Sequence, residues 1–446
     1  MSTFTITKNA KKCHNNDEIN LEKLAETLSE EFAAVLKSKE AREILKAVVQ
    51  SESLSEKEEQ LLKLKTVLMK SVSTLLLDET GYQGSRFLCS CGTQAKFIRY
   101  DEKGINLLFG KVNLKRALYH CQGCGSYIRP LDDLWELPSG RNSEGVERVS
   151  SLLGAFMPFE MAEEVLWETS GVSLSDNTIR TVSENIGSEM EQVIQTEIEN
   201  SQSHDLPEPQ AEVLAVLTDG TMVNTRDEQW KEVKVGAIAS YSRKNEKELE
   251  LEHASYTSFL GDVEGFRPRL WSEAYRRGAQ GREATLFLGD GSHWIWNLAD
   301  ELFPGAMQVL DYWHLCENVW KTAHEFFIDE EEKRDWVEDI TGKLRRGEVE
   351  KALRAVESLP EGGSKEALLG YINNNKGRMN YPELEEKGYP IGSGVIESAC
   401  KRIVGARHKQ AGMRWSKSGI QKMLNLSCFI HSDRWEEYWS HLRKAG

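Results

Sequence analysis

Apolar residues recur at helical spacing in the first part of the chain. They form two runs at intervals of three or four residues, from Leu21 to Leu36 and from Leu61 to Leu75. Such spacing places an apolar stripe along one face of a helix, and Ser55 with Glu58 has the form of a capping box in the second run. We therefore expect a helical arm over residues 1–80. Its apolar stripe fits internal packing and contact with a second copy equally well.

The pattern changes to alternating polar and apolar residues over residues 86–140. Turn residues at Asp101–Gly104 predict a hairpin between two strands there. The same region contains a C-x-C and a C-x-x-C pair, each followed by glycine: Cys89, Cys91, Cys121 and Cys124. Such spacing is typical of a zinc ribbon, although the first pair is one residue short of the usual C-x-x-C. We expect a zinc-ribbon-like β unit with one structural Zn²⁺; four reduced thiols in a small β unit are the alternative.

Helical spacing returns over residues 144–200. Here a helix from Ala162 to Thr169, Gly171 in a turn and Ser175 as the cap of a second helix have the form of a helix-turn-helix. The side facing the core is expected to contain Val172, Leu174, Ile179, Val182 and Ile186. The outer side of the second helix, which would contact a DNA major groove, is expected to carry Asn177, Arg180 and Ser183. Such helix pairs also occur as plain packing units, and Glu184 disfavours phosphate.

Strand signals appear after a polar linker that ends near Gln210. Strands are expected at 212–218, 231–241, about 248–256, 285–289 and 307–310, with helices around 262–278 and 293–302. This β-β-β-α-β-α-β order predicts an RNase H-like mixed-sheet catalytic core formed by residues 211–312 and 391–415. Residues 313–390 would be an all-helical insertion, and residues 416–446 a basic C-terminal helical tail. The chain as a whole is therefore expected to be a multidomain α+β protein.

Three acidic residues stand in this core where a metal-dependent nuclease needs them. Asp219 and Asp290 each follow a short apolar run, so each is expected at the C-terminal tip of a strand, and Glu397 lies where Ser393 or Gly394 can begin a helix. Carboxylates about 4 Å apart repel by roughly 4 kcal/mol per pair at an effective dielectric of about 20. Two Mg²⁺ or Mn²⁺ ions would relieve that repulsion and support in-line phosphoryl transfer. Each Asp-Gly pair alone is also a common turn.

A second polar motif follows the last expected strand. Asp311 and His314 lie one helical turn apart in Asp-Tyr-Trp-His, so both can face the same site. We expect His314 to orient an acid or a phosphate, or to protonate a leaving group. The alternative is that Asp311 caps a helix and His314 is a buried, hydrogen-bonded side chain.

Charge and composition set limits on the possible partners. The 446 residues carry a net charge of −15, which is unusual for a DNA-binding protein. Residues 398–446, however, contain ten Lys and Arg against three acids, a local +7. The cations expected to guide phosphates are Arg402, Arg407, Lys409, Arg414 and Lys417, although a solvated charged face is the alternative. No apolar run approaches a membrane span and no signal-like segment is present, so we expect a soluble cytoplasmic protein without a membrane partner.

Several longer motifs carry a family resemblance. TDGT, GDGSHWIWNLA, DYWHLCENVW, NNNKGRMNYPELEEKGYPIGSGVIESACK and GMRW, in this order, resemble bacterial insertion-sequence transposases of the ISKra type, which are related to Mutator-like DDE transposases. The resemblance runs from about Phe87 to Trp439. It implies that Asp219, Asp290 and Glu397 are the DDE triad and that Asp311 with His314 is the D-x-x-H signature. It further implies cutting of double-stranded DNA at element ends, joining to target DNA, and a homodimer or higher homo-oligomer.

Two other functions are compatible with some of these residues. A haloacid-dehalogenase-type phosphatase is suggested by Leu217-Thr-Asp219-Gly-Thr221, but its chemistry requires an Asp nucleophile where Leu217 stands. A catalytically idle DNA-binding regulator derived from a transposase would keep the zinc unit and the helix-turn-helix. The intact acids argue against this regulator.

Overall fold

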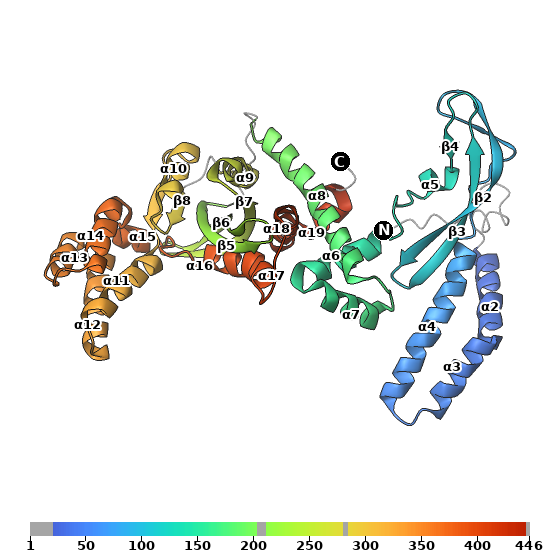
Figure 1. Ribbon diagram of the computed structural model, residues 1–446, viewed down its shortest axis with the longest axis horizontal. Helices are drawn as coiled ribbons and strands as arrows, with labels where there is room; N and C mark the ends of the chain where they lie inside the picture. The colour runs from blue at the N-terminus through green and yellow to red at the C-terminus, as the bar shows by residue number, and fades with distance from the viewer. Residues whose placement is uncertain (1–20, 203–210, 280–283, 443–446) are drawn as a thin grey trace. The chain divides into compact units, whose positions relative to one another are not determined.

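The computed structural model describes residues 21–202, 211–279 and 284–442, and it divides at Val182 into two compact units (Figure 1). Both units mix helices with a β-sheet, as expected for an α+β protein. Among the described residues, every helix is too short or too polar to cross a bilayer.

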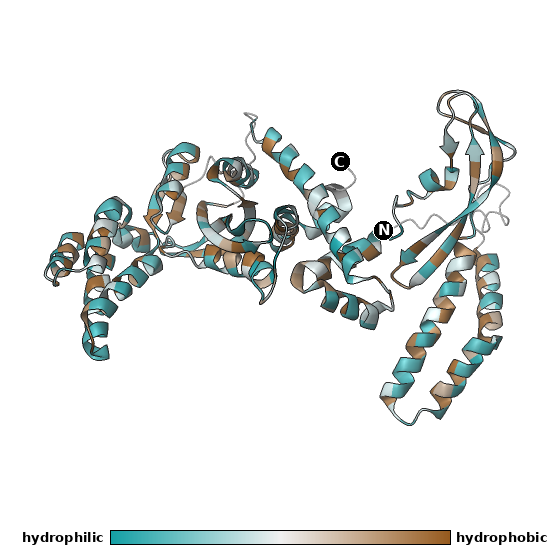
Figure 2. Ribbon diagram, in the orientation of Figure 1, coloured by the Kyte–Doolittle hydropathy of each residue, from teal (hydrophilic) through white to brown (hydrophobic). Residues whose placement is uncertain are grey.

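The first unit begins with an arm of three helices. They are α2 (Leu21–Lys37), α3 (Lys39–Gln50) and α4 (Leu54–Leu76); the two expected apolar runs lie in α2 and α4, and α3 between them, capped by Ser38, is a further helix that the sequence did not predict. The cap of α4 is Ser53, whose Oγ accepts from the Glu56 amide at 3.2 Å. This corrects the expected capping box, because Ser55 and Glu58 both lie inside the helix. Figure 2 shows apolar residues spread along all three helices, and none of the α2 residues is buried.

A four-stranded antiparallel sheet follows the arm. Its strands are β1 (Arg86–Leu88), β2 (Gln94–Leu107), β3 (Gly110–His120) and β4 (Tyr127–Ile128), in that order across the sheet. The hairpin turn is at Leu108 and Phe109, and Gly110 after it has φ +126°, which favours glycine. The expected turn at Asp101–Gly104 is therefore wrong. These residues continue β2, because each of them has a partner in β3.

Helices complete the first unit. They are α5 (Pro130–Leu134), α6 (Glu144–Phe156), α7 (Phe159–Ser170) and the start of α8 (Asp176–Asn200). Gly171 ends α7 in the left-handed conformation at φ 71°, and Ser175 Oγ accepts from the Thr178 amide at 3.3 Å at the start of α8. All five side chains expected to face the core are buried. The expected pair of helices and its turn is thus present.

The second unit is built around a five-stranded mixed sheet. Its strands are β5 (Val213–Thr225), β6 (Gln229–Asn245), β7 (Glu248–Leu260), β8 (Ala284–Gly289) and β9 (Met307–Leu310), arranged β7-β6-β5-β8-β9. β5, β6 and β7 are antiparallel meander strands, whereas β8 and β9 run parallel to β5. The connecting helices α9 (Val263–Arg276) and α10 (His293–Leu302) give the expected element order.

β5 is longer than its apolar run suggests. It continues past Asp219 to Thr225 because β6 pairs with it along this whole length, whereas its parallel pairing with β8 ends at Leu217. Asp219 was expected at the C-terminal tip of the strand, and this expectation is wrong. It lies at the point where the pairing with β8 stops, which leaves one edge of the strand open beside it.

The remaining elements are helical. After β9 come α11 (Tyr312–Phe326), α12 (Glu330–Arg345), α13 (Val349–Glu357), α14 (Gly363–Asn375), the 3-10 turn η1 (Lys376–Arg378) and α15 (Tyr381–Glu386). The chain then returns to the sheet as α16 (Gly394–Ala399), the π-helical η2 (Cys400–Gly405) and α17 (Ala406–His408), and ends with α18 (Lys417–His431), α19 (Trp435–Glu437) and the π-helical η3 (Tyr438–Leu442). α16 packs against β5 and β6, and α18 packs against β7.

Candidate functional site

The parallel half of the second sheet aligns three aspartates along one edge. Leu217 of β5 pairs with Leu288 of β8, and Gly289 of β8 pairs with Leu310 of β9. Neighbouring strands lie about 4.8 Å apart. If this register is continued by one or two residues, Asp219, Asp290 and Asp311 lie side by side at one level. This level is where the parallel pairing of the strands ends. Loops and side chains at this edge of a parallel sheet are where α/β folds usually bind ligands.

Asp219 is held in a partly desolvated place. Its Oδ1 accepts from the Gly220 amide at 2.6 Å, and the Cys400 thiol lies 3.6 Å from its Oδ2. Burial raises the pKa of Asp219, and the nearby Asp290 carboxylate raises it further; the two hydrogen bonds only partly offset this. The ionised form of Asp219 is therefore costly, and a positive charge at this edge would stabilise it.

Asp290 is fixed by the turn that follows it. Its Oδ1 accepts from the Ser292 amide at 2.8 Å, and Tyr371 of α14 donates to its carbonyl oxygen at 2.6 Å. Gly291 has φ +100°, and a Cβ there would lie 2.7 Å from the Tyr371 ring. Only glycine fits this backbone without strain, so the Asp-Gly pair both turns the chain and lets the helical segment approach.

The buried Asp311 and the half-buried His314 form a hydrogen-bonded pair beside the other two aspartates. Asp311 is 1% exposed and caps α11 by accepting from the Trp313 amide at 2.9 Å, while its Oδ2 lies 2.7 Å from His314 Nδ1. The bond to Asp311 raises the pKa of His314 to about 9 against the effect of burial. Burial alone would raise the pKa of Asp311, but the bonds from His314, Ser393 and the Trp313 amide lower it. His314 is therefore a cation at neutral pH, and Asp311 caps α11, as the alternative interpretation of this motif expected.

Glu397 lies on α16, whose helix begins after Ser393 as expected. Ser393 Oγ donates to Asp311, and Cys400 contacts Asp219, so residues on either side of Glu397 touch the aspartate row. The Glu397 side chain itself is 62% exposed and pairs with Lys401 at 2.6 Å. Among the described residues, the groups of three or more Asp, Glu, His or Cys ligand atoms within 4.8 Å of one another do not include Asp219, Asp290 and Glu397. The structure thus places the three aspartates at one level of neighbouring strands and brings the helix of Glu397 to them, but in the described residues neither the three aspartates nor the set with Glu397 has all its ligand atoms within 4.8 Å of one another.

The expected phosphate-guiding cations divide into exposed and buried ones. Arg402, Lys409, Arg414 and Lys417 are exposed. Lys409 donates to Thr221, two residues after Asp219, and therefore lies at the site. Arg407 is 1% exposed, with its guanidinium 4.6 Å from the centre of the Trp415 ring. The expectation that Arg407 guides phosphates is therefore wrong, because its side chain points into the core and packs on Trp415.

The expected DNA-facing residues of α8 also divide. Asn177 and Arg180 are exposed, and Arg180 donates to Asn177 Oδ1 at 2.6 Å. Ser183 is fully buried, which corrects its expected place on the outer side. The outer face of α8 in the first unit is therefore carried by Asn177 and Arg180.

The four paired cysteines meet in the first unit. Their sulfur atoms all lie within 4.8 Å of one another, with Cys89–Cys124 at 3.6 Å and Cys91–Cys121 at 3.5 Å. A tetrahedral site with Zn–S bonds of about 2.3 Å separates its sulfurs by about 3.8 Å. Glycines with positive φ follow each pair, Gly92 at 82° and Gly125 at 76°, and allow each chain to fold back around its thiols. The four sulfurs therefore fit a metal ion such as Zn²⁺.

Hydrogen bonds at the cluster already favour one thiolate. The Cys124 sulfur lies 3.2 Å from Ser126 Oγ, and its hydrogen bonds with the side chain and backbone of Ser126 lower the pKa of Cys124 to about 6. Bonds from Thr93 lower the pKa of Cys91. Thiolates rather than thiols bind zinc, so the protein supplies part of the ionisation that metal binding requires.

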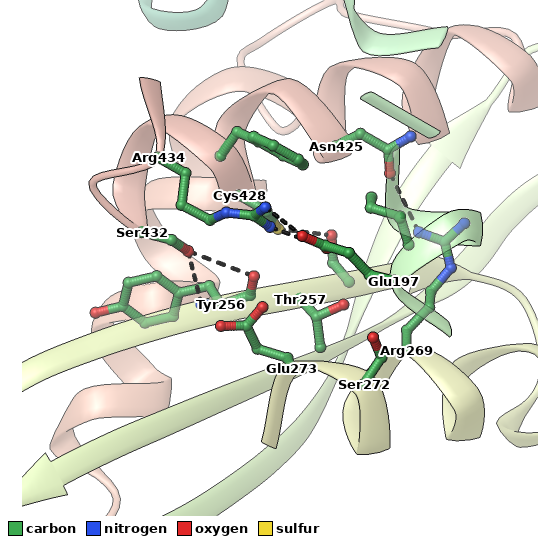
Figure 3. A pocket seen from close by; sticks show the side chains of 13 residues that line it. Glu197, Tyr256, Thr257, Arg269, Ser272, Glu273, Asn425, Cys428, Ser432 and Arg434 are labelled. Atoms are coloured by element: carbon green, nitrogen blue, oxygen red, sulfur yellow. Dashed lines mark hydrogen bonds and ion pairs between the residues drawn. The ribbon is translucent and has the colours of Figure 1, made fainter. Parts of the chain in front are cut away.

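A different polar cluster in the second unit is closed (Figure 3). Arg434 Nη1 pairs with Glu197 at 3.1 Å, and Arg269 Nη1 contacts Asn425 at 3.4 Å, around a cavity of about 20 Å³. Burial would raise the pKa of Glu273 beside them, but Arg276 and Arg434 outweigh it and lower the pKa. A space that holds one water, lined by groups that pair with one another, is an ionic core that joins α8, α9 and α18.

Sequence reasoning did not find the groups that connect Glu397 to the aspartates. Ser393 and Cys400 stand four residues before and three residues after Glu397, so all three share one helical face. That spacing was a usable signal. Tyr371 gave no comparable signal, because its contact with Asp290 depends on how the helices after β9 fold back.

One protein-family model matches most of the chain. The model described as an uncharacterised protein family, UPF0236, matches residues 53–439. The chain therefore belongs to the UPF0236 family. No curated protein matches it.

Proposed function

We propose that this protein is a DDE-type DNA transposase with an RNase H-like core. The observation that carries the proposal is the row formed by Asp219, Asp290 and Asp311 at the ends of parallel strands, with the helix of Glu397 against it. The sheet order β7-β6-β5-β8-β9, with α9 and α10 as connections, agrees with an RNase H-like fold. Proteins of the UPF0236 family are commonly associated with transposase-like insertion-sequence proteins, which supports the same function.

The donor atoms of the site fit divalent cations. Asp219 and Asp290 offer hard carboxylate oxygens, which Mg²⁺ and Mn²⁺ prefer, and burial together with the Asp290 charge raises the pKa of Asp219. Glu397 would join them once its pair with Lys401 opens. Bound at these residues, two such ions would activate the attacking oxygen and neutralise charge on the scissile phosphate.

The residues around the carboxylates have complementary tasks. His314 uses Nδ1 to bind Asp311, so its Nε2 is directed elsewhere and can donate to a phosphate oxygen or to the leaving 3′ oxygen. Its raised pKa, about 9, keeps that proton available at neutral pH. Lys409 at Thr221 adds a second positive charge beside Asp219. In the first step, water would attack the phosphodiester at an element end and release a 3′ hydroxyl, which in the second step would attack target DNA.

DNA recognition is assigned to other residues. Asn177 and Arg180 on α8 present a bidentate amide and a guanidinium, which pair well with base edges. Arg402, Arg414 and Lys417 are exposed cations suited to the backbone. Two element ends must be joined to one target, so the active form would be a homodimer or a larger homo-oligomer.

A catalytically idle DNA-binding regulator is the second candidate. Its support is the ion pair of Glu397 with Lys401, which leaves the third carboxylate away from the other acids. Such a protein would use the α8 face and the four-cysteine cluster without cutting DNA.

A strand-transfer assay separates the two candidates. The protein is incubated with labelled DNA from the ends of its own element, a target plasmid and Mg²⁺. We expect nicking and joining that disappear in Asp219→Ala, Asp290→Ala and Glu397→Gln, while band shifts in EDTA remain. Band shifts without cleavage under Mg²⁺ would favour the regulator, and cleavage at the wild-type rate by all three variants would exclude this active site.

A further inference from the structure

The first unit contains an open groove that none of the predicted DNA-contacting residues lines. It has a volume of about 670 Å³ and lies between the β2–β3 hairpin and the segment that leads from α5 to α6. Its cationic lining residues are Lys103, Lys111, Arg116, Arg129 and Arg141, against the acids Glu102 and Asp132. Five cations less two acids give a local charge of +3, in a chain whose net charge is −15. The groove therefore carries a positive local charge in a protein whose net charge is negative.

The floor of the groove is rigidly built. Asp101 pairs with Arg116 at 3.1 Å and with Arg129 at 2.7 Å, and Arg116 also pairs with Asp132 at 2.8 Å. Arg116 is only 8% exposed. A buried guanidinium between two carboxylates keeps its position because moving it would leave charges unpaired in a low-dielectric place. Arg116 and Arg129 are thus balanced in charge by Asp101 and Asp132 and give the groove a fixed floor, while its net positive charge comes from its other cations.

The wall opposite the hairpin is tied to β2 by the backbone. The Asn106 amide donates to the Arg141 carbonyl at 2.7 Å, and the Ser143 amide donates to the Asn106 carbonyl at 2.9 Å. Lys103 Nζ in addition donates to the Pro138 carbonyl. The segment before α6 therefore follows the strand as an extra edge, and the groove does not depend on a loose loop.

Two cations at the rim are available to a ligand. Lys111 is the cross-strand partner of Asn106, the same residue that binds the backbone of Arg141, so both side chains start from neighbouring positions. Both are exposed, and within the described parts of the chain neither makes an ion pair or a side-chain hydrogen bond. The stem of Lys111 crosses Gly104, where a Cβ would lie 2.8 Å from Lys111 Cε. Glycine at 104 thus lets the ammonium group reach over the groove.

We propose that this groove binds the phosphate backbone of DNA. The choice of DNA as the polyanion rests on the proposed function. Pockets of about 300–1,000 Å³ that hold small molecules are mostly apolar, whereas this groove has only Leu137 and Pro138 as larger apolar lining residues. An acidic peptide would need apolar subsites for specificity, while a sugar-phosphate chain needs fixed cations and an open path. The groove is therefore a DNA-contacting surface separate from α8 and from the basic C-terminal strip.

The test measures DNA binding by the full-length protein, without any requirement for catalysis. Affinity for a short fluorescein-labelled duplex of mixed sequence is measured by anisotropy without Mg²⁺, Mn²⁺ or chelator, between about 50 and 200 mM KCl. The variant is Lys111→Glu with Arg141→Glu. The charge-matched control is Arg99→Glu with Lys115→Glu, two exposed cations of the same sheet that do not line the groove. Circular dichroism and zinc content check that both proteins are folded.

We expect the groove variant to bind at least about tenfold more weakly and its log–log salt slope to fall by about 1.8, since each phosphate contact contributes about 0.9. The control should change both quantities much less. If the groove variant binds the duplex with the same affinity and salt slope as the wild type, the groove is not a DNA-binding surface. The proposed function would not be affected by that result. If DNA binding is weakened in the groove variant but the wild-type protein shows no strand transfer, the groove proposal stands and the catalytic proposal fails. Binding of polyglutamate but not of the duplex would replace DNA by an acidic protein partner.

Discussion

The two candidate metal sites differ in how closely their ligand atoms approach one another. The four cysteine sulfurs already lie within 4.8 Å of one another, whereas Asp219, Asp290 and Glu397 do not converge in this way. The cysteines come from two turns of one small sheet, so short-range folding alone gathers them. Of the four cysteines, Cys124 is favoured as a thiolate because bonds with Ser126 lower its pKa to about 6, while Cys121, with its pKa raised to about 11, stays a neutral thiol; carboxylates, in contrast, are charged and repel. A site made of acids is therefore expected to stay open until cations, with DNA, pull it together.

The largest expected effect concerns zinc binding at the four-cysteine cluster. Cys121→Ser removes one of four ligands from a structural centre whose zinc affinity corresponds to about 10–16 kcal/mol. We expect purified wild-type protein to contain one zinc per chain and the variant nearly none, with loss of protection from proteolysis over residues 86–140. Cys316→Ser, which alters a cysteine outside the cluster, serves as the control. A wild-type protein without zinc would show that the four thiols are simply packed together.

The open site predicts opposite changes in activity and stability. Asp219→Asn should lower strand transfer by about 10²–10³-fold, because it removes a charge used in the transition state. In EDTA at neutral pH the same variant should be more stable, because burial and Asp290 disfavour the ionised side chain. Urea unfolding of the second unit measures this. Adding Mg²⁺ should stabilise the wild type more than the variant.

A destabilised Asp219→Asn protein would contradict this account of the site. Equal stabilisation of both proteins by Mg²⁺ would show that the ions bind elsewhere. Asp300→Asn, on the exposed face of α10, provides a control for the loss of one surface carboxylate.

Within the second unit the sequence predicted β8 and β9 well because these two strands are short and mostly apolar. The run before Asp290 and the strand at Met307–Leu310 could be placed within a residue for this reason. The length of β5 could not be predicted, because its second half is held by β6 rather than by its own apolar character. The turn at Asp101–Gly104 failed similarly, since ion pairs of Asp101 keep those polar residues in a strand.

The site was predictable in its residue types but not in its geometry. Asp219, Asp290 and Asp311 follow from the strand ends and the parallel register. The state of Glu397 depends on Lys401, one helical turn away, and on a repulsion that sequence patterns do not express. The burial of Arg407 was likewise hidden, because a cation in a basic strip gives no sign that it stacks on Trp415.

A smaller effect is expected from the pH dependence of the Asp311–His314 pair. The pKa of His314 is raised to about 9, so its contribution to stability is full below the unfolded value of about 6.5 and is lost as the pH rises toward 9. With 38% of the side chain exposed, screening limits this contribution to about 1 kcal/mol. The stability difference between wild type and His314→Gln should therefore shrink between pH 6.5 and 9.

The double-mutant cycle with Asp311→Asn identifies the partner. In that background, His314→Gln should have little pH-dependent effect, because the carboxylate that raises the pKa is absent. A difference that persists with Asp311→Asn would assign the raised pKa to the remaining acids of the site.

The smallest effect addresses the open site directly. Glu397 and Lys401 form an exposed pair one helical turn apart at 2.6 Å, and such pairs contribute about 0.3–0.5 kcal/mol. Lys401→Met would release Glu397 for an ion, so the Mg²⁺ concentration that gives half-maximal strand transfer should fall by about twofold. Lys387→Met, which breaks the similar exposed pair with Glu383 outside the site, should leave it unchanged. A higher Mg²⁺ requirement in Lys401→Met would instead mean that Lys401 contacts DNA, and the ion pair would then be only its resting place in the absence of substrate.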